Sequence, residues 1–388
     1  TCRDWSSDVC SSDLVLREAA GDRALLDNQG QPTSAGRRLS AVARSMQDGL
    51  GALFVGASPP ESVVGIIHSQ SSIRAGWFLE RMVNPQDWRQ ALDQVMRGQG
   101  RSLVDEAQVT RGLHAWAALC EDFHLPYEFM DVVQIEADRL SHLDKCKVLI
   151  LPQAYALSES VASAVGAFAR RGGLVIADVL PGVMDEHGRT LAQGRLDDVF
   201  GVKAGSGRWS ATARAIAIPS SQKYLRVESM TIPAYLARTD LTVTTGSPLA
   251  HVDGTPVGVI NKVGNGWAVV LNMLIGDYPE QRVHGRGDAA VRQLVGAMMR
   301  ELGGVYPPIR LRPAQGGEDW PVAVTLWRSG AIAYLGLMNN VDLSITPIDQ
   351  AGPIMIERSC EVALPEQAHV YDIIAGEVAM CTPDELDC

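Results

Sequence analysis

The strongest constraint on the fold is a strand–helix–strand pattern near the middle of the chain. Residues 147–151 and 174–177 are short, mostly apolar runs, which are typical of strands buried on both faces of a parallel sheet. Ser158 can cap a helix between them, and Gly172 with Gly173 can end it. Because parallel neighbours need a crossover connection, this spacing predicts an α/β domain with helices on both faces of its sheet.

Two further predicted strands extend the sheet, one of them a continuous apolar run at 63–68. They bring the expected parallel strands to 63–68, 126–130, 147–151 and 174–177. Ligands of such sheets bind outside the carboxyl ends of the strands. We therefore expect the loops after His68 and Ala177 to share the edge at which a site would form.

Helical periodicity and turn residues predict the rest of this domain. Residues 113–123 carry apolar side chains at helical spacing, and Asp288 can cap a last helix that ends at Gly303. The Gly264-Asn265-Gly266 turn predicts a hairpin over 257–271. Residues 79–110, with Trp88, Leu92 and Met96 at helical spacing, form an expected insertion. Residues 205–250 show no regular pattern.

The two ends of the chain differ from this middle part. After Pro308 the pattern changes to short strands, which predicts a small antiparallel β-sandwich over 306–388. The expected strands are 322–327, 332–338, 354–356 and 370–374. Residues 15–60 offer a short strand at 23–27, a turn, and a helix capped by Thr33 or Ser34. That is too little to bury a core, so we expect this segment to end a preceding domain.

The first fourteen residues do not resemble the start of a protein. They read TCRDWSSDVCSSDL, without an initiator Met and without the basic start and apolar region of a signal peptide. The string is similar to translated sequencing adapter in metagenomic assemblies. We therefore expect residues 1–14 to be foreign and the native protein to be longer, which leaves its cellular compartment open.

Composition excludes several classes of protein. The chain has 34 basic and 45 acidic residues and a net charge of −11, which argues against a non-specific nucleic-acid binder. No apolar run approaches the roughly 20 residues of a membrane-spanning helix. Seven cysteines in 388 residues are too sparse for a disulfide scaffold.

A search for a nucleophile is negative. A cysteine amidotransferase or serine hydrolase places its nucleophile in a Gly-x-Cys-x-Gly or Gly-x-Ser-x-Gly turn after a strand, and neither pattern occurs. Cys120 lies on the apolar face of an expected helix, where burial is the simpler interpretation. Cys146, with His142 and Asp144, forms the only Cys/His/Asp cluster. No second ligand pair at metal spacing accompanies it, so polar surface residues before a strand are the simpler interpretation.

Other candidate sites are equally weak. The acidic residues do not occur in the pairs that glycoside hydrolysis requires. The run Asp185-Glu186-His187 is typical of a solvated turn, and the alternative is a loop at the edge of a ligand site. Arg286-Gly287-Asp288 is best explained by helix capping, and Gly205-x-Gly207 is no dinucleotide motif. A sugar-stacking platform could come from the tryptophans, although such residues usually lie in cores or interfaces. They are Trp77, Trp88, Trp116, Trp209, Trp267, Trp320 and Trp327. We assign no catalytic, cofactor-binding or metal-ligating residue.

The order of these segments resembles a known family. The run KVLILPQAYALSESVASAVGAFARRGGLVIADVLPGVMDEHGR (147–189) is similar to the trimerisation domain of glycoside hydrolase family 42 β-galactosidases. DNQGQPTSAGRRLSAVAR (27–44) resembles the exit from that family's (β/α)8 catalytic barrel. The resemblance covers residues 20–388. It implies a flavodoxin-like domain over 61–305, related to class I glutamine amidotransferases without their cysteine, followed by a small β-domain.

The resemblance also implies a function. The family's catalytic glutamates lie in the barrel, the general acid in an Asn-Glu pair that this sequence lacks. The chain is therefore expected to be a non-catalytic oligomerisation portion, trimeric, meeting a carbohydrate substrate only through the missing barrel. The alternatives are a stand-alone amidotransferase-like enzyme or a carbohydrate-binding module. Apolar residues beyond the needs of the strands support self-association through two different surfaces. They are Ile73, Trp77, Phe78, Leu79 and Trp88.

Overall fold

The computed structural model describes most of the chain in two units. The described residues are 25–83, 108–138, 143–203, 212–284, 288–313, 322–339, 360–363, 368–372 and 377–381, without residues 28, 180, 239 and 331. Residues 1–60 and 325–336 form the N-terminal unit, and residues 61–324 and 337–388 form the main unit. No helix in the described ranges is long and apolar enough to cross a membrane.

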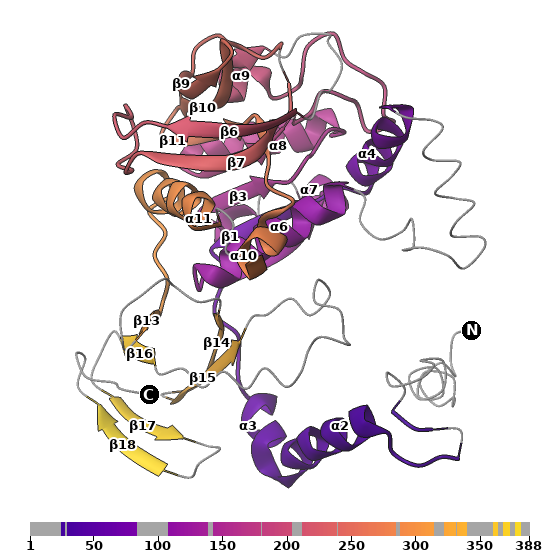
Figure 1. The fold of residues 1–388 in the computed structure, drawn as a ribbon, viewed down its shortest axis with the longest axis vertical. Coiled ribbons are helices and arrows are strands. Elements are labelled where there is room, and N and C mark those ends of the chain that lie inside the picture. Colours follow the sequence, from indigo (N-terminus) through magenta and orange to yellow (C-terminus); the bar gives the residue numbers. More distant parts are fainter. Residues whose placement is uncertain are drawn as a thin grey trace. The chain divides into compact units, whose positions relative to one another are not determined.

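The main unit is built on a seven-stranded mixed sheet (Figure 1). In spatial order its strands are β2 (Tyr127–Asp131), β1 (Val64–His68), β3 (Val148–Leu151), β4 (Leu174–Asp178), β11 (Gly266–Leu271), β10 (Thr255–Val263) and β9 (Ser247–Val252). The strands from β2 to β11 run parallel, β10 is antiparallel to β11, and β9 is antiparallel to β10. The prediction of four adjacent parallel strands is confirmed.

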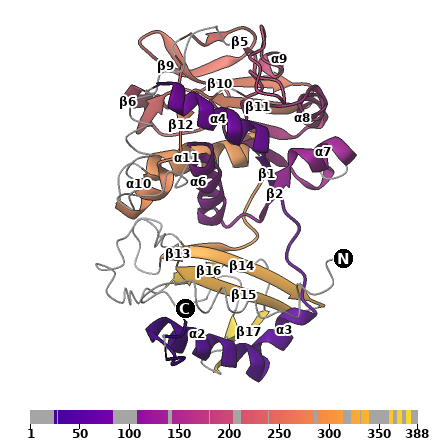
Figure 2. The same cartoon turned by 90° about the vertical axis from the view of Figure 1, so that its right-hand side faces the viewer.

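Both faces of the sheet are covered, because alternate residues of each strand enter different cores. Val64 and Ile66 of β1 pack with α6 (Gln108–Asp122) and α11 (Asp288–Ala297). Ile67 packs on the other face with α7 (Val132–Asp138), α8 (Glu159–Arg171) and α9 (Asp197–Phe200). Figure 2 shows these helices from a second direction. This two-sided burial explains why the strands read as continuous apolar runs.

The capped helix and the hairpin of the sequence pattern are both present. Ser158 Oγ accepts a hydrogen bond from Val161 N at 3.3 Å, and Gly172 ends α8 with a φ of 126°. The predicted hairpin is β10 and β11. Its turn packs so tightly that a Cβ on Gly266 would lie 2.2 Å from the carbonyl oxygen of Gly173. Glycine is therefore required at position 266.

A smaller sheet fills the region in which the sequence shows no regular pattern. It consists of β6 (Thr212–Ile218), β7 (Met230–Leu236) and β12 (Met273–Leu274), all antiparallel. Ile216 and Ile232 join the core under α6 and α11. Proline is rare inside strands because it cannot donate a backbone hydrogen bond. Pro233 in the middle of β7 therefore argues against a strand when only the sequence is considered. A short pair, β5 (Val202–Lys203) and β8 (Thr242–Val243), lies between α9 and β9 in the chain.

The helices before and after the expected insertion differ from the prediction. Helix α6 begins at Gln108, five residues before the predicted start, and α4 (Gln70–Val83) was not predicted. Both extend into the range 79–110 that the sequence analysis expects to be an insertion. Residues 84–107, with Trp88, Leu92 and Met96, lie outside the described residues. The remaining described helices of this unit are the 3-10 turn η3 (Leu143–Lys145), α10 (Tyr278–His284) and the π-helix η4 (Met298–Leu302).

The described strands of the C-terminal region form pairs. They are β13 (Arg310–Pro313) with β16 (Cys360–Ala363), β14 (Val322–Ser329) with β15 (Ile332–Asn339), and β17 (Ala368–Asp372) with β18 (Glu377–Cys381). The predicted strands at 322–327 and 332–338 are confirmed, and the one predicted at 370–374 begins at residue 368. The strand predicted at 354–356 lies outside the described residues.

The N-terminal unit joins two distant parts of the chain. It contains α2 (Ser34–Ser45), the π-helix η2 (Met46–Leu50) and α3 (Gly51–Val55). Gly36 N donates to Thr33 Oγ1 at 3.1 Å, which confirms the predicted cap. Ser58 and Arg328 exchange two backbone hydrogen bonds of 2.8 and 2.9 Å. The ring of Phe54 lies 5.9 Å from that of Trp327. Of the strand expected at 23–27, the described part shows an isolated bridge from Leu26 to Pro32.

Candidate functional site

The carboxyl edge of the parallel strands is the place where this class of sheet forms a site. Because β1, β3 and β4 pair in parallel, the loops after β1 and β4 share this edge, as predicted. The hydroxyls of Ser69 and Ser72 donate to Ala156 O at 3.1 and 3.0 Å, and Ala156 N donates back to Ser72 Oγ at 3.0 Å. Ala156 belongs to the loop after β3. The protein's own chain therefore occupies the space beside β1.

A buried carboxylate lies at the same edge. Asp178 is the last residue of β4 and its side chain is 0% exposed. It accepts hydrogen bonds from Gln153 N and from Trp116 Nε1, the latter at 3.4 Å. Burial raises the pKa of Asp178 to about 7, and the hydrogen bonds from Gln153 and Trp116 offset only part of that effect. The group is thus a carboxylic acid that ionises near neutral pH.

The backbone around Asp178 is held in an unusual conformation. Gln153 and Val179 have φ values of 41° and 57°, and a β-branched residue such as valine rarely adopts a positive φ. The side chain of Gln153 is buried and accepts the Tyr155 hydroxyl at 2.8 Å. A Cβ on Gly112 of α6 would lie only 2.9 Å from Gln153 Nε2. Tight packing of α6 against this loop therefore holds the edge closed.

Neither cysteine of the sequence analysis is activated. Cys120 lies on α6 as expected, and burial raises the pKa of its thiol far above the ordinary value. Burial raises the pKa of Cys146 to about 12, with Glu128 adding to the effect and Lys145 opposing it. Because the thiolate is the nucleophile, thiols with such raised pKa values are not activated at neutral pH. His142 lies outside the described residues, and Asp144 pairs with Arg171 at 2.7 Å.

The acidic candidates are structural. Asp185 Oδ1 accepts the backbone N–H groups of His187 and Arg189 at 2.9 Å each, as the solvated-turn interpretation predicts. Asp288 is the first residue of α11, and its carboxylate pairs with Arg292 one turn later. In place of the cap predicted for Asp288, the structure shows an ion pair between the first turn of α11 and the next. Arg286, Gly287, Gly205 and Gly207 lie outside the described residues.

The described tryptophans form no common platform. Trp116 is fully buried, and Trp77 lies partly exposed on α4. Trp267 packs against Tyr224, with ring centroids 4.9 Å apart, and Lys262 Nζ lies 4.3 Å from the Trp267 ring centroid. Trp88, Trp209 and Trp320 lie outside the described residues. Within the described ranges no group of three or more His, Cys, Asp or Glu side chains could hold a metal ion.

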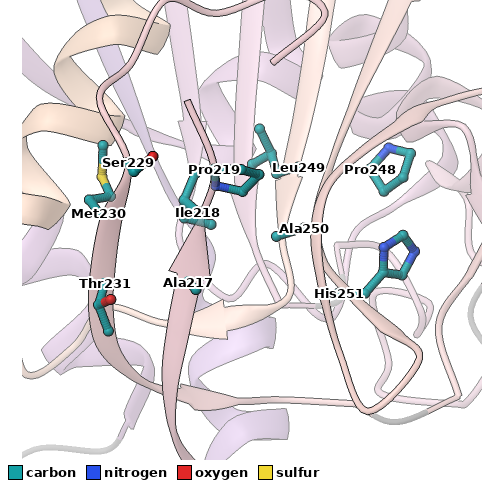
Figure 3. A pocket seen from close by; sticks show the side chains of 10 residues that line it. All are labelled: Ala217, Ile218, Pro219, Ser229, Met230, Thr231, Pro248, Leu249, Ala250 and His251. Carbon is teal, nitrogen blue, oxygen red and sulfur yellow. The ribbon is translucent and has the colours of Figure 1, made fainter. Parts of the chain in front are cut away.

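An open groove of about 710 Å³ lies between β6, β7 and β9 (Figure 3). Its lining is mainly apolar, with Ile218, Met230 and Leu249 among its members. His251 is its one titratable lining side chain. A glycosidase site needs two carboxyl groups that flank the scissile bond, and the lining of this groove supplies none.

A second polar cluster, which sequence reasoning missed, joins α6, α10 and α11. Arg282 Nη1 donates to Asp122 Oδ1 at 2.9 Å, and both side chains are less than 5% exposed. The Tyr278 hydroxyl donates to the other oxygen of Asp122, and Arg292 Nη1 lies 3.4 Å from the same hydroxyl. Burial raises the pKa of Asp122 despite the attraction of Arg282. Nothing in the spacing of these residues indicates that they meet.

The described part of the chain therefore defines a class of protein: an α/β domain whose usual ligand edge is filled by its own loops. The family model for the β-galactosidase trimerisation domain matches residues 64–303, more than half of the sequence. The chain belongs to this family, and the resemblance on residues 147–189 is confirmed.

Solved structures show the same fold. The β-galactosidase of Bacillus circulans sp. alkalophilus is 18% identical, with a TM-score of 0.62 over 93% of this chain and 46% of its own. Gan42B, a GH42 β-galactosidase from G. stearothermophilus, is 16% identical, with a TM-score of 0.60 over 94% and 45%. The α-L-fucosidase isoenzyme 2 of Paenibacillus thiaminolyticus is 16% identical, with a TM-score of 0.51 over 89% and 48%. The chain thus spans just under half the length of these structures. Comparison with curated proteins gives no match.

Proposed function

We propose that this chain is the non-catalytic oligomerisation portion of a glycoside hydrolase and that it holds three copies together. The observation that carries the proposal is the carboxyl edge of the sheet, where Ser69, Ser72 and Gln153 bond to the protein's own loops and strands. A fold that closes its ligand edge is suited to a scaffold. The name of the matched family supports the same role.

The finer fold assignment belongs to this proposal. We infer a flavodoxin-like domain over residues 61–305, since the spatial order β2-β1-β3-β4-β11 corresponds to the 2-1-3-4-5 order of that fold. The C-terminal strand pairs support a small β-sandwich over 306–388. Residues 15–60 are proposed as the end of a catalytic barrel, and residues 1–14 as foreign sequence.

The chemistry is then located outside this chain. A parent enzyme would hydrolyse β-galactosides or related glycosides with two carboxylates of a preceding barrel. The length of the family 42 structures, about twice that covered by this chain, supports such a parent. An amidotransferase-like enzyme, one of the two alternatives, needs an activated thiol. The protonated Cys120 and Cys146 do not provide one.

The oligomeric state tests this proposal. The purified 388-residue chain should sediment as a trimer at micromolar concentration, as expected of a closed ring. By mass action it should dissociate on dilution. Sedimentation velocity and equilibrium over a hundredfold dilution series measure this. A monomer at every concentration would contradict the trimer.

Enzyme assays test the non-catalytic part. The same preparation should hydrolyse neither nitrophenyl galactosides nor glutamine above the rate of a heat-denatured sample, since no paired carboxylates or activated thiol are found in its described residues. The positive control is an intact β-galactosidase assayed in parallel. Turnover that disappears when one residue of this chain is replaced would contradict the assignment.

A further inference from the structure

We infer that the outer edge of β2, with the start of α7, is one half of the contact between copies of this chain. The partner surface is the basic end of α8 beside the β10–β11 turn of the next copy. The inference rests on the proposed function and specifies which surfaces perform it. The two surfaces are called the β2 edge and the basic corner below.

The β2 edge is a terminal edge of the described sheet. Strand β2 is the terminal strand of the sheet and pairs with β1 on one side. Among the described strands none pairs with its other side. Unpaired edge strands are templates for association with another chain unless they are protected.

Large apolar side chains lie at this edge. Phe129, in the middle of β2, is 49% exposed, and Val133, in the first turn of α7, is 66% exposed. Tyr127 packs edge-on against Phe129 with ring centroids 5.8 Å apart, which fixes the Phe129 ring in place. A rigid, exposed aromatic side chain is the type of residue that anchors the centre of an interface.

The charge of the β2 edge selects the partner. Glu128, Glu136 and Glu159 are exposed around it, and Ser158 donates to Glu136, which joins the start of α8 to α7. Asp131 is paired with His68 at 3.0 Å. The described elements β2, α7 and the first turn of α8 contain no Lys or Arg. Two copies facing each other through this edge would oppose like charges, which is unfavourable. A different, basic surface must therefore meet it, as in a closed ring.

The same chain supplies such a surface. Arg170 and Arg171 are exposed at the end of α8, and the backbone carbonyl of Arg170 accepts Asn265 N in the β10–β11 turn at 3.0 Å. Lys262 is exposed in the same hairpin, and its Nζ donates to Asn265 O at 2.9 Å. Asp144 neutralises Arg171 in part. Arg170 and Lys262 remain to attract the glutamates of the neighbouring copy.

The experiment compares association constants of variants by sedimentation equilibrium. Phe129→Ser with Val133→Ser should weaken the trimer about 30-fold or more, because truncating central anchors has effects of this size. Val55→Ser, which alters an exposed side chain of α3 in the N-terminal unit, is the matched control and should leave association unchanged. Circular dichroism verifies that each variant is folded.

A charge exchange tests the pairing of the two surfaces without touching the apolar anchors. Glu128→Lys with Glu136→Lys, and separately Arg170→Glu with Lys262→Glu, should each weaken the trimer roughly tenfold. A single chain that carries all four changes should regain most of the lost trimer stability, because the opposite charges again face each other. A wild-type trimer that neither set of variants weakens would overturn this inference and leave the proposed function intact. A wild-type monomer would overturn both.

Discussion

Replacing Arg282 with Met should lower the free energy of unfolding by about 3–5 kcal/mol, because it leaves the carboxylate of Asp122 buried without its cation. The two groups lie 2.9 Å apart, and less than 5% of either side chain is exposed. Asp122→Leu alone should have a loss of similar size, since it leaves the Arg282 guanidinium uncompensated. Urea denaturation at fixed protein concentration measures both.

Two comparisons make this prediction specific. Arg171→Met breaks an ion pair of 2.7 Å whose side chains are 44% and 60% exposed, so its effect should stay within about 1 kcal/mol. The double variant Asp122→Leu with Arg282→Met removes both buried charges and should be less destabilised than the sum of the single variants. Strict additivity would show that the pair is not coupled.

The second large effect is a dependence of stability on pH that arises from Asp178. Burial raises the pKa of this carboxyl to about 7 in the folded protein, whereas the unfolded chain has the ordinary value of 3.8. Between these values the folded state holds a proton that the unfolded state has released. The free energy of unfolding therefore falls as pH rises from about 4 to 7, by roughly 4 kcal/mol for this group, and levels off above 7.

The Asp178→Asn variant isolates this contribution. Its amide cannot ionise, so the stability of the variant minus that of wild type should increase by about 3 kcal/mol between pH 5 and 8. Only this change with pH is diagnostic, because the amide also presents an N–H group to Trp116 Nε1. Asp144→Asn, at an exposed ion pair, is the control and should keep the wild-type profile. A constant difference across the range would show that Asp178 does not titrate there.

Sequence reasoning predicted the part of the fold in which local signals are strong. Strands β1, β3 and β4 were found because both of their faces are buried, which makes them continuous apolar runs. Helix α8 was found because Ser158 and Gly172 mark its two ends. The hairpin was found from the Gly264-Asn265-Gly266 turn. In each case the signal lies within a few residues of the element that it predicts.

The missed elements depend on partners far along the chain. Strand β7 contains Pro233 and a mixture of small and apolar residues, so its pairing with β6 is visible only in three dimensions. Helix α4 combines polar and apolar side chains, and its capping residue Ser69, whose Oγ accepts Ser72 N at 3.1 Å, directly follows the apolar run of β1. The closed carboxyl edge could not be predicted either. It requires Ser69 and Ala156, 87 positions apart, to meet.

The position of β11 has a consequence for the order in which the protein matures. This strand lies between β4 and β10, and Trp267 is in register with Leu174. At the centre of the sheet, β4 therefore pairs with a strand that leaves the ribosome much later than β4 itself. Until residue 271 has emerged, the open side of β4 has no neighbour, and such a side invites wrong partners during synthesis. Pairings this distant in sequence also form slowly. During synthesis the nascent chain thus exposes the unpaired side of β4, which β11 covers in the folded protein.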